Sequence, residues 1–328
     1  MIVTFGEALL RFSTPTPMLL SQSIGRELDF FVGGSELNVA LACQAQGLPA
    51  RWVSALPDRE VGDLALHWIR GQGIDTTHVS RGPGRMAYYL LETGASPRPS
   101  RVLERQTGIL GESLDLARGI DWRTALSGAS WFHTSGITAG LSTACRAAIT
   151  NAMQTARSNG IPVSYDFNFR RRIWSLDQAR AGQLPLLEHV DVLFCSAADI
   201  TGLLEVKLPP RNSDGYFDSV RAAFAPYKIQ TIVLSERDSE HTYRVVVLDQ
   251  DAAAISRTLD LDVVDRIGAG DAMTAGFLRA RLEERDLQAQ ADFAAFCGAL
   301  KHSVPGDFLP LGRHEVDAMF TSGGSLQR

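Results

Sequence analysis

Short apolar segments alternate with stretches of helical character along most of the chain, and this alternation restricts the possible folds more than any other feature. A strand, helix, strand rhythm predicts an α/β fold in which helices cover both faces of a mostly parallel sheet. The N-terminal residues 1–6 have the apolar character of a buried first strand. The further expected strands are 53–56, 130–133, 162–165, 192–195 and 231–234.

Two regions depart from this rhythm, residues about 9–32 and about 84–107. In the second region, the runs 88–91 and 101–104 have the character of antiparallel strands, so a small separate sheet is expected. A small sheet inserted near the strand ends of such a domain is placed to act as a lid over a ligand site. With no long linker in the sequence, we expect one domain over 1–328 and a flexible tail at 321–328.

Composition excludes several classes of protein. The chain has 328 residues, 45% of them hydrophobic, which is enough to bury a large α/β core. Its net charge of -5 argues against a nucleic-acid surface. The four cysteines are far apart and show no zinc-ligand spacing, which predicts core thiols. Without a run of roughly 20 apolar residues or a signal-peptide pattern at the N-terminus, a cytoplasmic protein is expected.

The segment 264–272 is the most informative stretch for function. The alternating run 259–264 predicts a strand, and apolar residues recur at helical spacing from Ala272 onward. Between them, the backbone N–H groups of Gly268, Ala269 and Gly270 would lie at the positive end of a helix macrodipole, where a phosphate binds well. Asp271 is either an ordinary helix cap or a carboxylate placed to receive a proton.

Two common phosphate-binding motifs are excluded. No Gly-Lys-Ser/Thr sequence follows a glycine-rich turn, so there is no Walker A loop. The dinucleotide fingerprint fails because Met273 occupies the position of its third glycine or alanine, and because the motif lies near the C-terminus. A nicotinamide-dependent enzyme is therefore disfavoured.

A second glycine pair opens another expected helix. The absence of side chains at Gly33 and Gly34 would allow a polyol to approach the backbone closely, and Asn38 offers a hydrogen-bond donor and an acceptor to a hydroxyl. The same pattern also fits a helix start with tight packing. Sugar contact and close packing therefore both remain open for this segment.

Two further segments carry polar residues at element ends. Alternation after the strand at 162–165 puts Asp166, Asn168 and Arg170 on one face, at the carboxyl end where open α/β sheets bind ligands. Arg171 and Arg172 are expected to form a solvated turn. The small-residue helix at 296–303 is followed by a Pro-Gly turn and Asp307; it fits either a flat base or tight packing on a sheet.

The order of these motifs resembles the PfkB, or ribokinase-like, carbohydrate kinase family over nearly the whole chain, and most of all its 2-keto-3-deoxygluconate kinase branch. The resemblance rests on 5–7, 33–40, 264–271 and 298–307, together with the Asp-x-Asn-x-Arg segment. It implies a three-layer α/β/α sandwich with a small β-sheet lid. It also implies ATP-dependent phosphorylation of a sugar-acid hydroxyl with Mg²⁺, and a homo-oligomer, as a dimer formed through the lids.

The resemblance also assigns roles to residues. Asp271 matches the catalytic base, and Gly268, Ala269 and Gly270 match the anion hole. Substrate contacts are implied for the glycine pair and several polar residues: Gly33, Gly34, Asn38, Tyr89, Arg105, Arg170 and Asp307. Nucleotide contacts are implied for Asn168, Ser196, Ser235, Gly268, Gly270 and Gly298. Asp199 is expected to reach magnesium through water.

The two arginines support an acid substrate independently of the family. An aldonate carboxylate favours guanidinium groups that donate two parallel hydrogen bonds, so Arg105 and Arg170 tilt the choice toward a sugar acid. Arg170 serves ATP phosphates equally well. A kinase for fructose or another ketose is the nearest alternative, and a non-catalytic sugar-binding protein is another; a nucleoside kinase leaves the arginines without a partner.

The sequence departs from the family pattern at several positions. Leu103 stands where a tyrosine is common in the branch, and the usual Asn-x-x-Glu is replaced by Ser196 and Asp199. Ser235 and Asp238 fill later glycine positions. These replacements predict altered affinity for nucleotide or substrate and leave the carboxylate of Asp271 in place.

Overall fold

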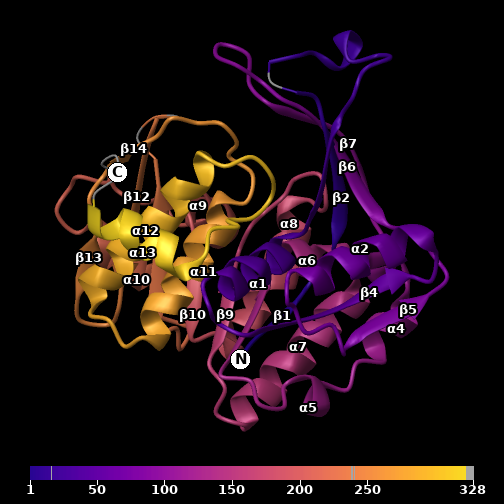
Figure 1. The fold of residues 1–328 in the computed structure, drawn as a ribbon. Coiled ribbons are helices and arrows are strands. Elements are labelled where there is room, and N and C mark those ends of the chain that lie inside the picture. Colours follow the sequence, from indigo (N-terminus) through magenta and orange to yellow (C-terminus); the bar gives the residue numbers. More distant parts are fainter. Residues whose placement is uncertain (16, 238, 240, 323–328) are drawn as a thin grey trace.

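The computed structural model describes residues 1–15, 17–237, 239 and 241–322. Within these residues the main element is a ten-stranded sheet with the order β13-β12-β11-β10-β9-β8-β1-β4-β5, and β14 pairs with β12 off that path. The strands from β5 to β11 in this order run parallel, and β12 joins β11 antiparallel. The predicted α/β fold with a mostly parallel sheet is confirmed (Figure 1). The strands are β1 (Ile2–Phe5), β4 (Ala50–Pro57), β5 (Val79–Gly82), β8 (Trp131–Ser135), β9 (Val163–Asp166), β10 (Val192–Cys195), β11 (Thr231–Glu236), β12 (Thr242–Leu248), β13 (Ala253–Ile255) and β14 (Leu259–Asp260).

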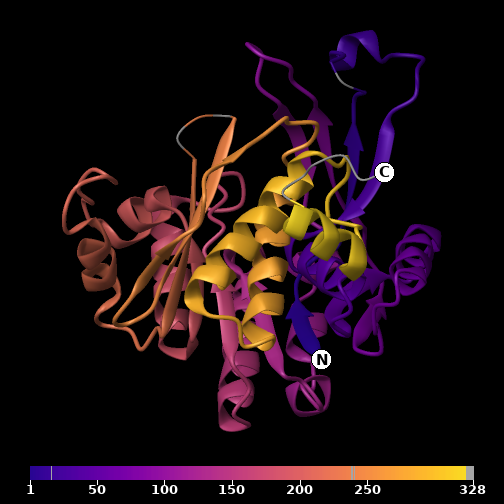
Figure 2. The same cartoon turned by 60° about the vertical axis from the view of Figure 1, so that its left-hand side comes forward.

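Helices cover both faces of this sheet because successive side chains of a strand point to opposite sides. In β1, Ile2 belongs to a core with α1, α11, α12 and α13, whereas Val3 and Phe5 belong to a core with α7 and α8 on the other face. Figures 1 and 2 show the resulting three layers. The helices are α1 (Ser35–Ala45), α2 (Glu60–Gly71), α3 (Ile109–Glu112), α4 (Leu114–Arg118), α5 (Trp122–Ala125), α6 (Gly136–Leu141), α7 (Thr143–Ser158), α8 (Leu176–Gln183), α9 (Ala197–Leu204), α10 (Tyr216–Phe224), α11 (Ala269–Leu282), α12 (Leu287–His302) and α13 (Arg313–Ser322), with 3-10 turns η1 (Leu20–Gln22) and η2 (Leu184–His189).

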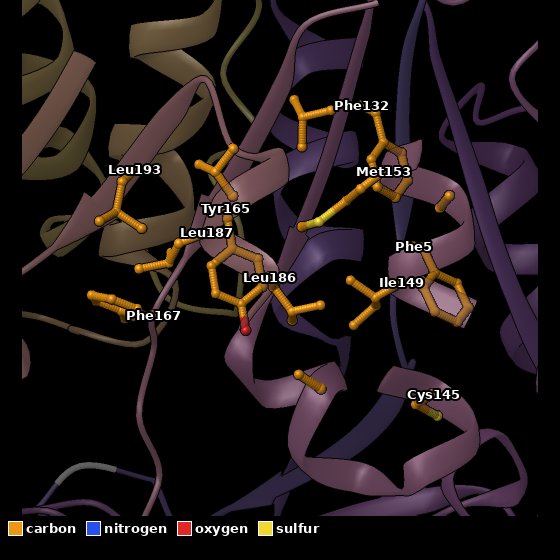
Figure 3. Close-up of a cluster of buried hydrophobic side chains, with 14 of the residues drawn as sticks. Phe5, Phe132, Cys145, Ile149, Met153, Tyr165, Phe167, Leu186, Leu187 and Leu193 are labelled. Atoms are coloured by element: carbon orange, nitrogen blue, oxygen red, sulfur yellow. The ribbon is translucent and has the colours of Figure 1, made fainter. Parts of the chain in front are cut away.

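A dense apolar core fixes the strands that border the site. Phe5 and Phe132 from the sheet pack in one cluster with Ile149 and Met153 of α7, and Tyr165 of β9 lies in the same cluster (Figure 3). Each of these side chains is fully buried, and burying one large apolar side chain contributes about 1.5–3 kcal/mol. The carboxyl ends of β1, β8 and β9 are thereby held in fixed positions.

The small sheet has the order β3-β2-β6-β7 and projects beyond the main sheet in both views (Figures 1 and 2). Strands β6 and β7 pair antiparallel, which confirms the expectation for 88–91 and 101–104. Strand β2 pairs antiparallel with β3 and parallel with β6. Its strands are β2 (Leu9–Ser13), β3 (Asp29–Gly33), β6 (Ala87–Glu92) and β7 (Arg101–Gln106).

The prediction of a strand at 259–264 is wrong for all but its first two residues. Only Leu259–Asp260 forms a strand, and it pairs with β12. The next residues leave the sheet because the N–H groups of Val264 and Asp265 donate to the carbonyl of His302, 2.8 and 3.0 Å away, at the end of α12. An alternating pattern therefore accompanies an irregular segment that lies against a helix end.

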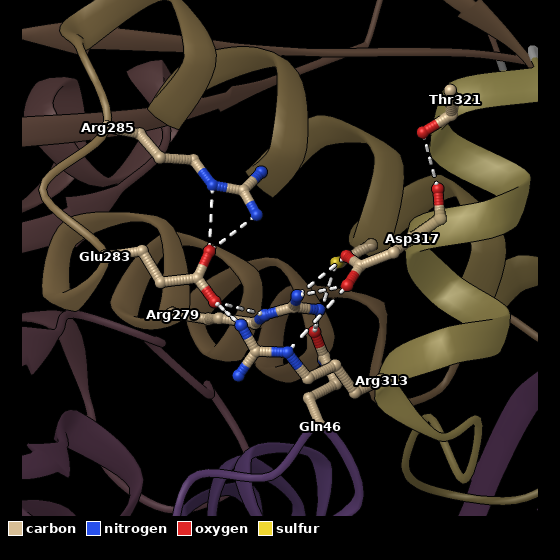
Figure 4. A network of polar contacts seen from close by, with 8 residues as sticks. Gln46, Arg279, Glu283, Arg285, Arg313, Asp317 and Thr321 are labelled. Atoms are coloured by element: carbon tan, nitrogen blue, oxygen red, sulfur yellow. Dashed lines mark hydrogen bonds and ion pairs between the residues drawn. The ribbon is translucent and has the colours of Figure 1, made fainter.

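The carboxyl-terminal helix α13 is joined to the body by a network of charged residues (Figure 4). Arg279 of α11 donates to Asp317 of α13 at 2.6 and 2.7 Å and to Glu283 at 3.0 Å. Of the tail expected to be flexible, Thr321 and Ser322 are the last residues of α13, and 323–328 lie outside the described residues. Among the helices that the structure describes, none is both long and apolar enough to cross a bilayer.

Candidate active site

The start of α11 forms part of the wall of a cavity of about 780 Å³. Gly268 caps this helix in a left-handed conformation with φ 77° and lies against the carbonyl of Asp307, where a Cβ would clash. At Gly270 an added Cβ would meet only open space, so the backbone is bare on the cavity side. Because the first N–H groups of a helix have no partner within the helix, this turn presents donors and a positive dipole end to an anion.

Asp271 lies in the first turn of α11 and is 9% exposed. Its carboxylate accepts hydrogen bonds from the Ser35 hydroxyl at 2.7 Å and from the Asn38 amide at 2.8 Å. Burial raises the pKa of Asp271 to about 6, against the opposing effect of the two hydrogen bonds. The amide oxygen of Asn38, Oδ1, is buried and has no hydrogen-bond partner among the described residues. A buried carboxyl group that ionises near neutral pH therefore faces the cavity beside the helix start.

A second acidic group lies at the carboxyl end of β9. Asp166 lines the cavity, and burial followed by repulsion from Asp199 and Asp271 raises its pKa to about 8. The N–H of Asn168 donates to Asp166 at 3.0 Å, and the Asn168 amide donates to the Ser35 hydroxyl at 2.9 Å. Two other acidic side chains thus repel a negative charge on Asp166 in one cavity, which favours a bound cation.

The three polar residues predicted to share a strand face do line the same cavity, although for a different reason. Strand β9 ends at Asp166, and Asn168 has φ 38°, so strand alternation does not extend to Arg170. The chain turns instead, and Arg170 is exposed at the cavity together with Arg171 and Arg172.

The opposite wall comes from β6, β7 and the segment around Asp307. Tyr89 donates to Asp307 at 3.0 Å, and Arg105 pairs with Glu7 at 2.8 Å. Tyr89, Arg105 and Asp307 were all expected in one site, and they line one cavity. Each is already engaged with a protein partner. Burial raises the pKa of Glu7, although the Arg105 guanidinium opposes that shift.

The residues that depart from the family pattern have local roles. Ser196 and Asp199 form a reciprocal cap at the start of α9. The Ser196 hydroxyl donates to the Asp199 carboxylate at 2.6 Å, and the N–H of Asp199 donates to the Ser196 hydroxyl oxygen at 3.2 Å. Ser196, Asp199 and Ser235 line the cavity. Leu103 is 36% exposed on β7, and Asp238 lies outside the described residues.

Two glycines expected in the site lie behind it. Gly298 of α12 lies against the ring of Tyr243, with a Cβ position 2.6 Å from the ring, and it is not among the residues that line the cavity. Gly33 leaves space for the carboxylate of Asp307, whereas its neighbour Gly34, with φ 142°, does line the cavity. Close packing accounts for Gly298 and Gly33, which was the alternative left open for both segments.

Sequence reasoning did not assign roles to two charged residues near the cavity, Glu7 and Arg11. Glu7 orients Arg105, and Arg11 bridges Asp265 at 2.7 Å and Asp307 at 2.8 Å while 4% exposed. Charged residues within apolar strand sequences at 5–12 were the available signal, because burial of a charge requires a partner. In the described residues no group of three or more His, Cys, Asp or Glu side chains is arranged to hold a metal by itself.

Comparison with known proteins agrees with this geometry. The chain is 29% identical to 2-dehydro-3-deoxygalactonokinase of Haloferax volcanii, with 98% of this chain and 97% of that protein covered. It is 28% identical to 2-dehydro-3-deoxygluconokinase of Thermoproteus tenax, with 93% and 89% covered. The crystal structure of 2-dehydro-3-deoxygluconokinase from Thermotoga maritima superimposes with a TM-score of 0.91 at 33% identity, covering 98% of each chain. The sequence model of pfkB family carbohydrate kinases matches residues 1–311, and the chain therefore belongs to this family of sugar-phosphorylating enzymes.

Proposed function

We propose that this kinase transfers the γ-phosphate of ATP to a hydroxyl of 2-keto-3-deoxy-D-gluconate and forms the 6-phosphate. The observation that carries the proposal is the placement of Asp271, a buried carboxyl group with a pKa of about 6, in the same helix turn as Gly270, whose backbone is open to the cavity. The names of the two relatives and of the Thermotoga maritima structure support the choice of substrate class.

Asp271 is suited to act as the general base. With a pKa near 6 its carboxylate is mostly ionised at pH 7, yet it remains basic enough to accept a proton from an alcohol as the phosphoryl group arrives. Hydrogen bonds from Ser35 and Asn38 fix its orientation. In a loose phosphoryl-transfer transition state, positioning and charge stabilisation supply most of the rate enhancement, and the proton is accepted late.

The N–H groups of Gly268, Ala269 and Gly270 form the anion hole in this proposal. They stabilise negative charge on the transferred phosphoryl group, and the positive end of the α11 dipole adds to this effect. Asn168, Ser196, Ser235 and the exposed Arg170 line the same cavity on the side assigned to the nucleotide. Arg170 also attracts Asp166 and Asp271 electrostatically, so it can serve either substrate.

Magnesium fits the acidic side of the cavity. Mg²⁺ is usually held by one or two carboxylates, substrate phosphates and several waters, so a cage of three protein ligands is not needed. Asp166 and Asp199 are the residues that would hold it, directly or through water, because both line the cavity, and burial followed by repulsion from Asp199 raises the pKa of Asp166. When bound, the ion neutralises phosphate charge; the chain's contribution is to keep these two carboxylates together.

Arg105 is the residue proposed to recognise the acid group. Its side chain is 16% exposed and lines the cavity, and its guanidinium donates to Glu7 at 2.8 Å and to the Thr107 hydroxyl at 3.3 Å. The remaining donor capacity of the guanidinium is what we propose for the substrate carboxylate. Tyr89 and Asp307 contribute hydroxyl contacts on the same wall. A neutral ketose offers this guanidinium no carboxylate with which to form a charge-assisted hydrogen bond, which favours the acid.

The small sheet is proposed to act as a lid that excludes water, since water would otherwise compete as the phosphoryl acceptor. Apolar side chains are exposed on this part of the molecule: Phe30 of β3 is 45% exposed, and Ile24 in the connection between β2 and β3 is 84% exposed. Two lids covering these apolar side chains for each other would form a dimer, which is the oligomer we propose.

Substrate-dependent ADP release tests the function. The purified protein is offered ATP and Mg²⁺ with ketodeoxygluconate, its galactonate epimer, fructose and ribose, and the product is identified by phosphorus NMR. We expect kcat/KM for the ketodeoxy acids to exceed that for neutral sugars by at least about 10²-fold, the effect of one unpaired charged contact. Preference for fructose would instead assign a ketose kinase, in line with the plant fructokinases that are 26% identical over 93% of the chain. No ADP release with any sugar would indicate a non-catalytic sugar-binding protein.

A further inference from the structure

Lys301 is a buried cation that the proposed mechanism does not use. It lies in the last turn of α12 and is 0% exposed, although the chain contains only two other lysines, Lys207 and Lys228. Its ammonium donates to the carbonyl of Val304 at 2.7 Å and to the carbonyl of Asp265 at 3.4 Å. Lys301 therefore connects the backbone at Asp265 with the backbone at Val304, 39 residues further along the chain.

Both segments shape the start of α11. The Asp265 carboxylate accepts the N–H of Ile267 at 3.0 Å and the N–H of Gly306 at 3.1 Å, which joins the two segments a second time. Gly268 lies directly against the carbonyl of Asp307. Any separation of these segments would displace Gly268, and with it the direction of the N–H groups that begin the helix.

We propose that Lys301 is a positioning residue for phosphoryl transfer, whose ammonium clamps the 265 and 304 carbonyls and so aims the N–H groups of residues 268–270 at the phosphate. This inference rests on the proposed kinase function. Lys301 is not among the residues that line the cavity, so it acts through the backbone and not by touching the substrate. Its fixed positive charge behind the helix start adds to the potential that attracts phosphate.

The charge of Lys301 is not explained by stability. Burial lowers the pKa of Lys301 to about 8 and Arg11 lowers it further, against the attraction of Asp265, Asp307 and Asp271. An unbranched apolar side chain of similar size would fill the same space without the desolvation of an ion, and replacement of buried charges by apolar residues is often neutral or stabilising. The alternative is that Lys301 only caps carbonyls at the end of α12.

The first test compares Lys301→Met with Lys228→Met, the same change at an exposed lysine. Because small displacements of positioning groups cost large factors in rate, we expect Lys301→Met to lower kcat per folded enzyme about 10- to 100-fold. KM for the sugar should change less than twofold, and Lys228→Met should match the wild type. A change in melting temperature with unchanged kcat would reduce Lys301 to a helix cap and overturn the proposal.

The second test asks whether the positive charge itself is needed. Lys301→Ala removes the equivalent of n-propylammonium, so this amine is added back, with 1-propanol as the neutral control and tetramethylammonium as a cation without N–H donors. We expect saturable recovery of kcat with n-propylammonium alone. Equal recovery with 1-propanol would show that only packing is required, and no recovery in a folded variant would also contradict the clamp.

Kinetics of the wild type and two variants distinguish a failure of the Lys301 role from a failure of the kinase function. If Asp271→Asn is inactive while Lys301→Met keeps full kcat, the clamp is wrong and the kinase assignment stands. If the wild type releases no ADP with any sugar, the function itself is wrong, whatever the lysine variants do.

Discussion

Buried charges are paired with opposite charges at one end of α11 and lack such partners at the other end. At the carboxyl end, Arg279 is 1% exposed and faces two carboxylates, those of Glu283 and Asp317 (Figure 4). Arg285 and Arg313 also pair with Glu283, each at 2.6 Å, so cations and anions alternate through the network. At the amino end, Asp271 is held by the neutral donors Ser35 and Asn38, and two further carboxylates lie across the cavity.

The pKa values express the same contrast. Hydrogen bonds and attraction from the arginines lower the pKa of Glu283 in spite of its partial burial, whereas burial raises the pKa of Asp271 to about 6 and of Asp166 to about 8. One end of the helix is optimised for the folded state. The other end keeps charges that the fold disfavours, and such mismatched groups cluster where substrates or metal ions supply the missing partners.

The largest effect is expected for Asp271→Asn. The change keeps the shape and removes the base, so kcat should fall by about 10²- to 10⁴-fold while ATP affinity stays within a few-fold. Asp317→Asn is the matched control at the other end of α11 and should keep kcat within about twofold, as expected for a change far from the reacting groups. Steady-state kinetics and nucleotide titration measure both. Near wild-type turnover of Asp271→Asn would remove the residue from the base role.

The next effect concerns the acid end of the substrate. Arg105→Ala should raise KM for ketodeoxygluconate by about 10- to 100-fold, the worth of a charge-assisted hydrogen bond, and change KM for ATP far less. Arg101→Ala is the control, because Arg101 lies on the same strand, is 60% exposed and pairs with Glu92. If both substrates were affected equally, Arg105 would not belong to the sugar site.

A change at the carboxyl end should separate stability from activity. Arg279→Met removes the cation shared by Glu283 and Asp317 and should lower the free energy of unfolding by about 2 kcal/mol, less than for a fully buried pair because Asp317 is 40% exposed. Urea unfolding provides the value, and kcat/KM below the melting transition should remain unchanged. A large loss of kcat in the folded variant would contradict the division between the two ends.

The smallest effect is expected at the metal. Asp199→Asn keeps an oxygen that can cap α9 and removes one negative charge near Asp166, so the magnesium concentration for half-maximal activity should rise about 10-fold. Asp177→Asn, at the first turn of α8 with its carboxylate 91% exposed, provides the control. An unchanged magnesium dependence would assign Asp199 to capping alone.

The fold was predictable because its signals are local. Short apolar strands separated by helical segments indicated the parallel sheet, and the runs in β6 and β7 indicated the small sheet. The prediction of a strand at 259–264 failed for a non-local reason, because the N–H groups at the end of this segment donate to the carbonyl of His302 and not to a neighbouring strand. Alternation alone does not distinguish a strand from an irregular segment with the same exposure pattern.

The site was predictable only in part, because some of its contacts are local in sequence and others are not. Glycines and Asp271 follow one another along the chain, so their motif is readable. The charges of Glu7 and Arg11 in an apolar stretch indicate that each needs a partner. No local pattern identifies those partners, Arg105 and Asp307, because they lie 98 and 296 residues away. Gly298 shows the converse, because a glycine that fits a ligand pocket fits the ring of Tyr243 equally well.

The free energy of unfolding of Asp271→Asn as a function of pH tests the central contrast most directly. The pKa of Asp271 is about 6 in the folded protein against a usual value of 3.8, so the fold favours the protonated form. The stabilising effect is complete below about pH 4 and is lost as the pH rises through about 6, and the asparagine variant does not lose it. We therefore predict that Asp271→Asn is more stable than the wild type by about 1–2 kcal/mol at pH 7.5, with a difference that shrinks toward pH 4. A variant that is less stable at pH 7.5, or a difference independent of pH, would contradict the account.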